Sequence, residues 1–491
     1  MRKLTIKNPV VGGLVAGAWC LAAHAVESDW EQNPLDHGQP ITASVDFTVK
    51  GGSVRALNGI NGGPSAMTPR TQQMKDFEPL NVPSVRLHDI PLANPGVKLV
   101  DVQDIFPIWN AKTDPKDAAN YFFDETDDYI ATIRDCGVKE IVYRLGTSIE
   151  WTSPRQHFAK YPKNVDQYVE VCAGIVRHYM SGWAGGFDGR GLRWKWEVWN
   201  EPNLKGPCFD RELEAYFDLY IRISKRLHSE FPSVEVGGPA LTGLDTGYLK
   251  GFFNACRKAD ASVDFCTWHS YFKTPLGGKW ALARIGEWRK WLDDNGWKGT
   301  KLYLTEWNYF PCMWSDFDTV KGKLRWQRGT ADGMHGLDAA AFLTLCLTRW
   351  QSLPLDGAHL YMFDSPNWGF YSPEGLKYPP YWSFRLFGSF IEGEPTLVKV
   401  SDHENFALLA GETKDGRRKI LVSDFKPGES SVEMRRVIPL KGVPERGTAK
   451  ISMVEGGFEE LRTESVSYSD SKIVLPAKVV GGSAVYLIEF N

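Results

Sequence analysis

The stretch Trp194–Leu204, WKWEVWNEPNL, starts like a strand buried in a sheet and ends on polar residues. Its first half, WKWEVW, is rich in the aromatic and β-branched side chains that strands favour. Asn200 and Glu201 follow directly. A second run, Leu302–Asn308 (LYLTEWN), has the same texture and contains Glu306 near its end. Both runs therefore predict strands that carry a glutamate to one edge of a sheet.

Between residues 54 and 390, short β-rich runs alternate with amphipathic helical stretches. This alternation predicts a parallel sheet with crossover helices. The predicted strands are Val54–Ile60, Ser84–His88, Glu140–Leu145, Arg193–Trp199, Glu235–Gly238, Val263–Trp268, Lys301–Thr305 and Ala358–Phe363. Predicted helices between them include Asp124–Cys136, Asn164–Met180, Glu212–Glu230, Thr246–Ala259, Ala281–Asn295 and Thr330–Gln351. Eight such units fit an α/β fold, the (β/α)8 TIM barrel, whose active sites lie at the carboxyl ends of the strands.

A doubly wound open sheet is the competing fold for the same alternation. The glycine-rich run after the first predicted strand, GINGGPS at residues 59–65, lacks the spacing of a dinucleotide-binding loop. A closed barrel also relates the two glutamates, because its fourth and seventh strands lie across the mouth from one another. Glu201 and Glu306 are then expected to point into one central pocket.

After Gly393 the sequence changes to short alternating strands separated by turn residues. The runs are ENFALLAGE, KILVSDF, SVEMRRVIPL, TAKISMVE, KIVLPAK and SAVYLIEF. Asp-Gly and Pro-Gly dipeptides stand where hairpin turns would fall. We predict a C-terminal β-sandwich domain at residues 393–491, after a barrel domain at residues 26–392. Residues 44–50, SVDFTVK, are a candidate extra strand of the sandwich.

The N-terminal segment up to Ala25 has the organisation of a secretory signal peptide. Arg2, Lys3 and Lys7 form its basic opening, and residues 10–23 form its apolar middle. A signal cleaved after Ala25 predicts a secreted or periplasmic protein. A membrane anchor is the alternative, but the apolar run is short for a span of about 20 residues. No later segment is apolar enough to cross a bilayer, so no membrane partner is expected after cleavage.

The mature chain is predicted to be acidic, which bears on its partners. Without residues 1–25 it has 54 basic and 60 acidic residues, a net charge of −6. A nucleic-acid partner needs a clustered basic face, and the sequence shows none. The seven remaining cysteines form no CxxC pair and no cluster with histidine. The sequence therefore predicts neither a metal nor a cofactor.

Two opposed carboxylates suit glycoside hydrolysis. One carboxyl group protonates the departing oxygen, and the other attacks the anomeric carbon or activates water. The structural alternative is that Glu201 and Glu306 are only ion-pair partners. Their equivalent places at the ends of two barrel strands favour the catalytic interpretation.

Several segments resemble one family in clan A of the glycoside hydrolases. They are VRLH (85–88), EVWNEPNL (197–204), VGGPAL (236–241), WHSY (268–271) and LYLTEWN (302–308). In this order, on these predicted strands, they are similar to glycoside hydrolase family 39, the family of β-xylosidases and α-L-iduronidases. The resemblance covers the predicted barrel, about residues 54 to 390, and a sandwich after the barrel is also typical of the family.

The resemblance implies a retaining mechanism with Glu201 as general acid/base and Glu306 as nucleophile. It implies that Asn200 binds the 2-hydroxyl of the sugar. It also implies a set of pocket residues that orient the carboxylates or the sugar: Arg86, His88, His269 and Tyr271. A cationic Arg86 beside Glu306 would separate the pKa values of the two glutamates. The two histidines could instead be satisfied core residues, and Arg86 only a buried counter-ion.

Strand parity places Glu197 on the same side of its strand as Glu201. We interpret Glu197 as a deeper supporting carboxylate that needs a cation, for which Arg144 and Arg86 are the candidates. Asp89 stands where β-xylosidases tend to have glycine, and it could contact a sugar hydroxyl or cap a loop.

The eighth predicted strand departs from the family pattern, which usually offers a tryptophan to the sugar. Here Tyr361 stands on that strand and Trp368 follows in the loop, so either could form the stacking platform. The tryptophans near predicted rim positions are Trp151, Trp199, Trp307, Trp314 and Trp368, and we place Trp307 and Trp368 among the substrate-binding residues. A disulfide between Cys208 and Cys312 is a further option, since both follow catalytic strands.

We therefore expect an exported, retaining glycoside hydrolase, most simply an exo-acting β-xylosidase-like enzyme on oligosaccharides or polysaccharide fragments. The alternatives are an endo-acting or differently specific hydrolase (arabinosidase, iduronidase-like or exopolysaccharide-degrading) and a carbohydrate-binding barrel without turnover. The presence of both glutamates counts against the last alternative. The sequence does not fix the glycone or the oligomeric state.

Overall fold

The structure is a computed structural model that describes the chain from residue 43 onward, with gaps. The described residues are 43–64, 70–91, 98–149, 160–189, 191–272, 279–312, 319–320, 322–323, 333–365, 367–427, 436–454, 456, 461–476 and 482–490. The predicted signal peptide lies outside them, as do Trp151 and Trp314. Within these ranges, no helix is long and apolar enough to cross a membrane.

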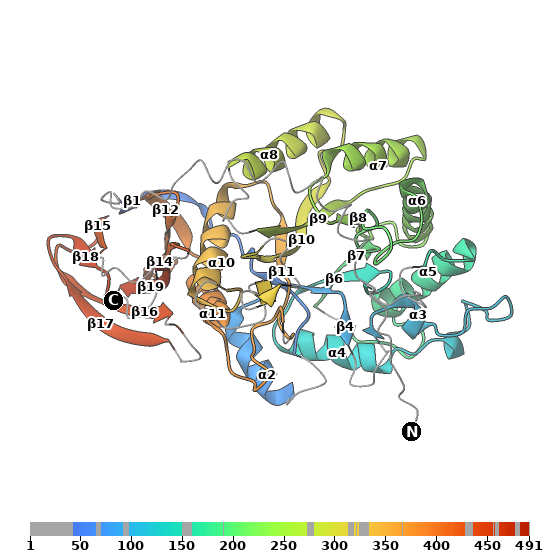
Figure 1. Cartoon of the computed structure of the whole chain (residues 1–491), viewed down its shortest axis with the longest axis horizontal. Coiled ribbons are helices and arrows are strands. Elements are labelled where there is room, and N and C mark those ends of the chain that lie inside the picture. Colours follow the sequence, from blue (N-terminus) through green and yellow to red (C-terminus); the bar gives the residue numbers. More distant parts are fainter. Residues whose placement is uncertain are drawn as a thin grey trace, which may run out of the picture.

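Eight parallel strands close into a barrel (Figure 1). They are β2 (Gly59–Asn61), β3 (Ser84–Leu87), β6 (Glu140–Leu145), β7 (Arg193–Val198), β8 (Val236–Leu241), β9 (Phe265–Phe272), β10 (Lys301–Tyr309) and β11 (Gly357–Leu360). Each strand pairs with the next, and β11 pairs with β2, so the barrel sheet has no free edge. The predicted barrel is confirmed, and every one of its strands overlaps a predicted one.

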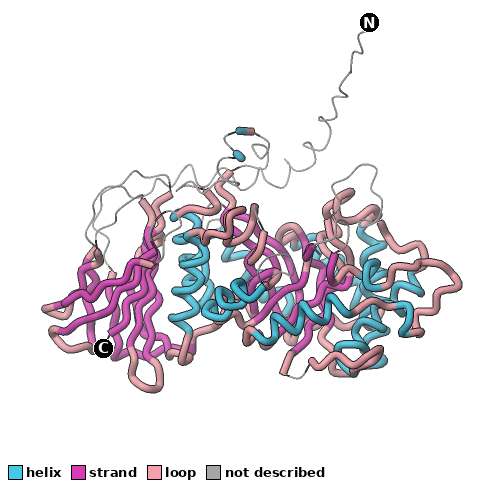
Figure 2. The backbone as a smooth tube through the Cα atoms, turned by 90° about the horizontal axis from the view of Figure 1, so that it is seen from below, coloured by secondary structure: helices cyan, strands magenta, loops and turns pink. Residues whose placement is uncertain are grey.

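Helices surround the barrel strands on the outside (Figure 2). They include α2 (Arg70–Phe77), α3 (Val102–Ile105), α4 (Asp124–Asp135), α5 (Val165–Ser181), α6 (Leu213–Glu230), α7 (Thr246–Lys258), α8 (Lys279–Asp294), α10 (Leu337–Arg349) and α11 (Pro379–Ile391).

The local sequence determines where helix α5 begins and ends. Asn164 caps α5 by accepting a hydrogen bond from the Gln167 amide at 3.1 Å. Gly182, in the left-handed conformation, ends the same helix.

Two barrel strands continue further than their sequence pattern predicted. The predicted runs stop at Trp268 and Thr305, where polar residues begin. In the structure β9 continues to Phe272 and β10 to Tyr309. His269 and Glu306, in these extensions, are buried and lie close together, so polarity at this position does not mark the end of a strand.

A second, nine-stranded sheet stands at one end of the molecule (Figure 2). Its strands are β1 (Ser44–Ser53), β12 (Thr396–Ser401), β13 (Phe406–Glu412), β14 (Arg418–Asp424), β15 (Val437–Lys441), β16 (Gly447–Val454), β17 (Arg462–Tyr468), β18 (Lys472–Val474) and β19 (Ala484–Phe490). The early strand β1 lies between β12 and β15. The ring centroids of Phe47 on β1 and Phe490 on β19 lie 5.9 Å apart, although three strands separate β1 from β19 in the sheet. The sheet therefore curves so that its two halves enclose a common apolar core.

The sequence pattern predicted neither β12 nor β17. The side chains of β17 alternate between partly buried and exposed, so it has no strong apolar pattern. The central strands β14 and β19 are buried on both faces. Ile420 belongs to the core of the sheet, whereas its neighbour Leu421 belongs to the core shared with the barrel.

Helices α10 and α11 lie between the nine-stranded sheet and the barrel (Figure 1). The Ser423 hydroxyl donates a hydrogen bond to the Ala341 carbonyl at 2.7 Å. Arg349 forms an ion pair with Asp402 at 2.9 Å. The sheet is thus joined to the barrel through apolar packing and through polar contacts from α10.

Candidate active site

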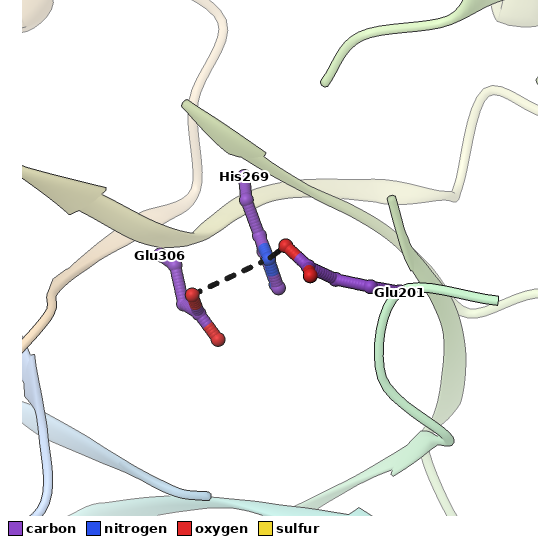
Figure 3. A group of neighbouring side chains, drawn as sticks. All are labelled: Glu201, His269 and Glu306. Atoms are coloured by element: carbon purple, nitrogen blue, oxygen red, sulfur yellow. Dashed lines mark hydrogen bonds and ion pairs between the residues drawn. The ribbon is translucent and has the colours of Figure 1, made fainter. Parts of the chain in front are cut away.

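Glu201, His269 and Glu306 meet at the carboxyl ends of the barrel strands (Figure 3). Glu201 follows β7, His269 lies on β9 and Glu306 lies on β10. One side-chain atom from each lies within 4.8 Å of the others. Glu201 is 8% exposed and Glu306 is 4% exposed, so both carboxyl groups are held away from bulk water.

The backbone after β7 turns sharply to present Glu201. Its φ of 47° and that of Trp199, 69°, are in the left-handed region that side-chain-bearing residues seldom adopt. The Glu201 amide donates to the Ala240 carbonyl at 2.9 Å, and its carbonyl accepts from the Leu204 amide at 2.8 Å. These two hydrogen bonds stabilise the turn. Backbone strain that the surrounding structure maintains in this way is common at functional sites.

Arg86 on β3 is fully buried and organises the floor of the pocket. Its Nη1 donates to Glu306 Oε1 at 2.7 Å, and its Nε donates to Glu197 Oε2 at 2.6 Å. Its Nη2 donates to Asn200 Oδ1 at 2.8 Å. A fourth contact joins Nη1 to Asn61 Oδ1 at 3.2 Å. Arg86 is therefore the cation that Glu197 needs, and the same guanidinium also stabilises a negative charge on Glu306.

Glu306 has a second donor on its other oxygen. The Tyr271 hydroxyl donates to Glu306 Oε2 at 2.6 Å. Burial raises the pKa of Glu306, while Arg86 and the Tyr271 hydrogen bond lower it. The pKa of Glu306 is raised overall by burial, but hydrogen bonds on both oxygens, one of them from a guanidinium, favour the ionised form more than the surroundings of Glu201 do.

Glu201 has no direct cationic partner among the described residues. Its Oε1 lies 2.8 Å from His269 Nδ1, and its Oε2 accepts a hydrogen bond from the Cys208 thiol at 3.7 Å. Burial, and then the charge of Glu306, raise the pKa of Glu201 to about 8. Burial and Arg86 lower the pKa of His269 well below its usual range, so His269 is neutral at pH 7. The surroundings of Glu201 thus favour a protonated carboxyl group near neutral pH.

Several buried polar atoms around the two glutamates have no hydrogen-bond partner in the described part of the protein. They are His88 Nε2, Arg144 Nη1, Asn200 Nδ2 and His269 Nε2. The guanidinium of Arg86 can only donate, so Asn200 must turn its oxygen to Arg86 and keep its amide donor free. Leaving a buried donor unpaired costs about 1–3 kcal/mol. Asn200 Nδ2, beside Glu201 in the chain, and His88 Nε2, 3.7 Å from Glu306 Oε1, could donate to the hydroxyl groups of a ligand.

Comparison with known proteins agrees with this geometry. Residues 99–285 match the family model of glycosyl hydrolases family 39. This confirms, for that segment, the family 39 resemblance predicted from the sequence. The matched segment contains Arg144, Glu201 and His269, while Glu306 follows it.

Curated relatives match over shorter stretches. A β-xylosidase of Geobacillus stearothermophilus is 32% identical over 110 residues, 22% of this chain and 21% of the relative. A β-xylosidase of Caldicellulosiruptor saccharolyticus is 29% identical over 161 residues, 30% of this chain and 32% of the relative. These alignments thus span about a fifth and about a third of the two relatives.

A solved structure matches over nearly the whole chain. The glucosidase from Croceicoccus marinus superposes with a TM-score of 0.70 and 19% sequence identity, covering 92% of this chain and 99% of the other. At this identity the likeness shows the fold, a barrel followed by a second sheet. The β-xylosidase relatives and the glucosidase structure leave the sugar specificity to be argued from the pocket.

Three aromatic residues that the sequence placed near the site lie close together. The ring of half-buried Trp368 lies 5.4 Å from that of Tyr271 and 6.0 Å from that of Tyr361, with both contacts edge-on. Trp368 also stacks on Phe310 at 6.0 Å. Tyr271, Tyr361 and Trp368 therefore form one aromatic wall beside the glutamates, which is consistent with a stacking surface for a sugar ring.

Trp307 is not part of the pocket, and its predicted contact with substrate is wrong. It is fully buried, and its ring lies 4.6 Å from Trp350 and 6.4 Å from Phe384. Neighbouring side chains on a strand point to opposite faces, so Glu306 inside the barrel puts Trp307 outside it. Trp199 is likewise a core residue, since it is fully buried and donates its indole N–H to the Cys208 carbonyl.

The structure also bears on two further options from the sequence. No disulfide joins Cys208 to Cys312. Asp89 forms an ion pair with Lys98 at 3.1 Å and accepts a hydrogen bond from the Tyr361 hydroxyl at 3.4 Å. This partly buried carboxylate next to His88 is therefore tied to the aromatic wall.

Geometry alone would let Glu201, His269 and Glu306 hold a metal ion. Their chemistry fits a metal poorly. A carboxyl group with a pKa of about 8 is protonated at pH 7 and is a weak ligand. The guanidinium of Arg86 also lies against Glu306, where it would repel a divalent cation. The donor set agrees with the sequence in favouring acid–base chemistry over a metal site.

Some residues of the site were not singled out from the sequence. Asn61 ends β2 and contacts Arg86, a position that the strand-end rule used for Asn200 could have found. Asp101 gave no comparable signal, and the sequence suggested Cys208 only for a disulfide, because both residues lie in loops whose course the sequence pattern does not predict.

Proposed function

We propose that this protein is a retaining glycoside hydrolase with Glu201 as general acid/base and Glu306 as nucleophile. The observation that carries the proposal is the unequal pairing of two buried carboxyl groups: Glu306 has Arg86 and Tyr271, and Glu201 has neither. Side-chain atoms of the two glutamates within 4.8 Å of one another are consistent with direct attack, because inverting enzymes separate their carboxyl groups by about 6.5–9.5 Å to admit a water.

The reaction would proceed in two displacements. In the first, Glu306 bonds to the anomeric carbon while the bond to the departing oxygen breaks and Glu201 gives that oxygen its proton. In the second, the Glu201 carboxylate takes a proton from water, and this water displaces Glu306 from the anomeric carbon. Arg86 and Tyr271 would stabilise the charge that returns to Glu306.

For the substrate we propose a neutral β-linked sugar of the xylose type, removed from the end of an oligosaccharide or polysaccharide. The β-xylosidase relatives support the xylose type. The charges around the pocket support neutrality, since Glu197, Glu306 and Asp89 form ion pairs with two cations, Arg86 and Lys98, while Arg144 is paired with Asp101. Export to the periplasm or the medium, predicted from residues 1–25, remains part of the proposal.

The test is turnover of a panel of aryl glycosides: β-xyloside, β-glucoside, α-arabinofuranoside and α-iduronide. We expect the β-xyloside to be the best substrate and ¹H NMR to show the β-anomer as the first product. If the β-xyloside gave the α-anomer first, the retaining mechanism would be overturned. Sugar binding by calorimetry without turnover of any member would favour a carbohydrate-binding barrel instead.

A further inference from the structure

Three fully buried residues form a connected group behind the pocket: Asp101, Arg144 and His88. His88 directly follows β3, Arg144 lies on β6, and Asp101 directly precedes α3. Asp101 accepts hydrogen bonds from Arg144 Nη2 and from the amide and hydroxyl of Ser148, the last two at 2.8 and 3.0 Å. The guanidinium of Arg144 is therefore held in one orientation.

That orientation determines the protonation of His88. Arg144 Nε lies 3.2 Å from His88 Nδ1. An arginine nitrogen can only donate, so Nδ1 must accept and cannot carry a proton. The ring must then be neutral, with its single proton on Nε2. Burial, Arg86 and Arg144 all lower the pKa of His88, which agrees with a neutral ring.

The proton on Nε2 faces the reacting centre. His88 Nε2 lies 3.7 Å from Glu306 Oε1, which is beyond hydrogen-bond distance. It has no other partner in the described part of the chain. Glu306 Oε1 already accepts from Arg86, so the donor of His88 is left for a ligand beside the nucleophile.

The hydrogen bonds of Arg144 go to His88 and Asp101, whereas Arg86 balances the charge of Glu197, the neighbour of Arg144 on the next strand. We propose that Asp101 and Arg144 are positioning residues that fix His88 as a permanent donor to one hydroxyl of the sugar. This inference rests on the proposed function for the identity of the ligand. The tautomer itself follows from the contacts of Arg144.

The first test needs no turnover. Long-range ¹H–¹⁵N NMR of the wild-type protein distinguishes the two ring nitrogens, with His88 assigned from the spectrum of His88→Gln. We expect an unprotonated Nδ1 and a protonated Nε2 throughout the pH range in which the protein is folded. A proton on Nδ1, or an imidazolium at pH 6, would overturn the inference whatever the activity of the protein.

The second test measures the consequence for binding. Arg144→Lys keeps a cation for Asp101 and removes the planar Nε donor. We expect its kcat/KM on an aryl glycoside to fall about tenfold, mainly through KM. The fall should vanish on the one monodeoxy glycoside that lacks the hydroxyl bound by His88. Equal losses on all monodeoxy substrates would show a merely structural role.

Two variants control this comparison. His88→Gln can turn its amide oxygen to Arg144 and its amide N–H₂ to the pocket, so it should retain more activity than His88→Met. The reverse order would contradict the inference. Arg226→Lys, in an ion pair with Glu170 on the outer helices, should leave kcat/KM unchanged. If no glycoside is hydrolysed, the NMR result still decides the tautomer while the proposed function fails.

Discussion

The surroundings of Glu201 and of Glu306 differ although both side chains are nearly fully buried. Glu306 is bonded by a guanidinium and a phenol, each of which stabilises a carboxylate. Glu201 is bonded by a neutral imidazole and a thiol, which stabilise a carboxylate only weakly. Two carboxyl groups at similar depth can thus take opposite protonation states, and in the proposed mechanism the donors around each determine which one is the acid and which the nucleophile.

Removing the carboxylates one at a time should give the largest effects. Glu306→Gln is expected to reduce kcat by about 10⁵-fold on every substrate, because no other group can attack the anomeric carbon. Glu201→Gln should lose about 10²–10⁴-fold on natural glycosides and much less in the glycosylation step with an activated aryl leaving group, which needs no proton. Steady-state and pre-steady-state rates of both variants on natural and on activated glycosides measure these losses. Equal losses for Glu306→Gln and Glu201→Gln on both substrate types would show that the two glutamates do not have different roles.

Removing the shared cation should reduce stability. Arg86→Met leaves Glu197 and Glu306 buried without a counter-ion, which is expected to lower the free energy of unfolding by about 3–5 kcal/mol. Urea unfolding followed by circular dichroism gives this number. Arg349→Met, at the partly exposed pair with Asp402, should cost much less. A loss at Arg86 no greater than that at Arg349 would show that Arg86 does not balance the buried charges.

The pH profile follows from the two pKa directions. Activity needs Glu201 protonated, so kcat/KM should fall as the pH rises through about 8. It also needs Glu306 ionised, so activity should fall at acid pH, with a midpoint above the usual pKa of a glutamate because burial raises this pKa. In Glu306→Gln the repelling charge is gone, and the pKa of Glu201 should drop below 8, as ¹³C NMR of labelled glutamate can show. An unchanged pKa would mean that the two carboxyl groups do not interact.

The smallest predicted effect concerns the thiol. Cys208→Ala removes a donor to Glu201 Oε2, so the pKa of Glu201 and the basic limb of the pH profile should move up, by less than about one unit. Cys208→Ser keeps a donor and should return the basic side of the pH profile to its wild-type position. If the wild-type protein and both variants lost activity at the same basic pH, the thiol would only fill space.

The sequence predicted most of the barrel and both glutamates, because strand periodicity and strand ends are local features. Glu201 and Glu306 could be related without a structure because a closed barrel places its fourth and seventh strands across its mouth. The place of Trp307 was missed because an aromatic residue beside a catalytic one looks like a substrate contact, although strand alternation puts it on the outer face. The links from Asp101 and Cys208 to the site depend on tertiary contacts across 43 and 7 residues of chain, which no local pattern encodes.

The assignment of roles to the two glutamates is tested most directly by trapping the covalent intermediate. A 2-deoxy-2-fluoro glycoside with a good leaving group slows both displacements and allows the glycosyl-enzyme to accumulate during reaction with the wild-type protein. Peptide mass spectrometry should find the sugar on Glu306, in the peptide that contains LYLTEWN. A sugar on Glu201, or an enzyme that turns over the parent glycoside and never forms a covalent adduct, would contradict the account.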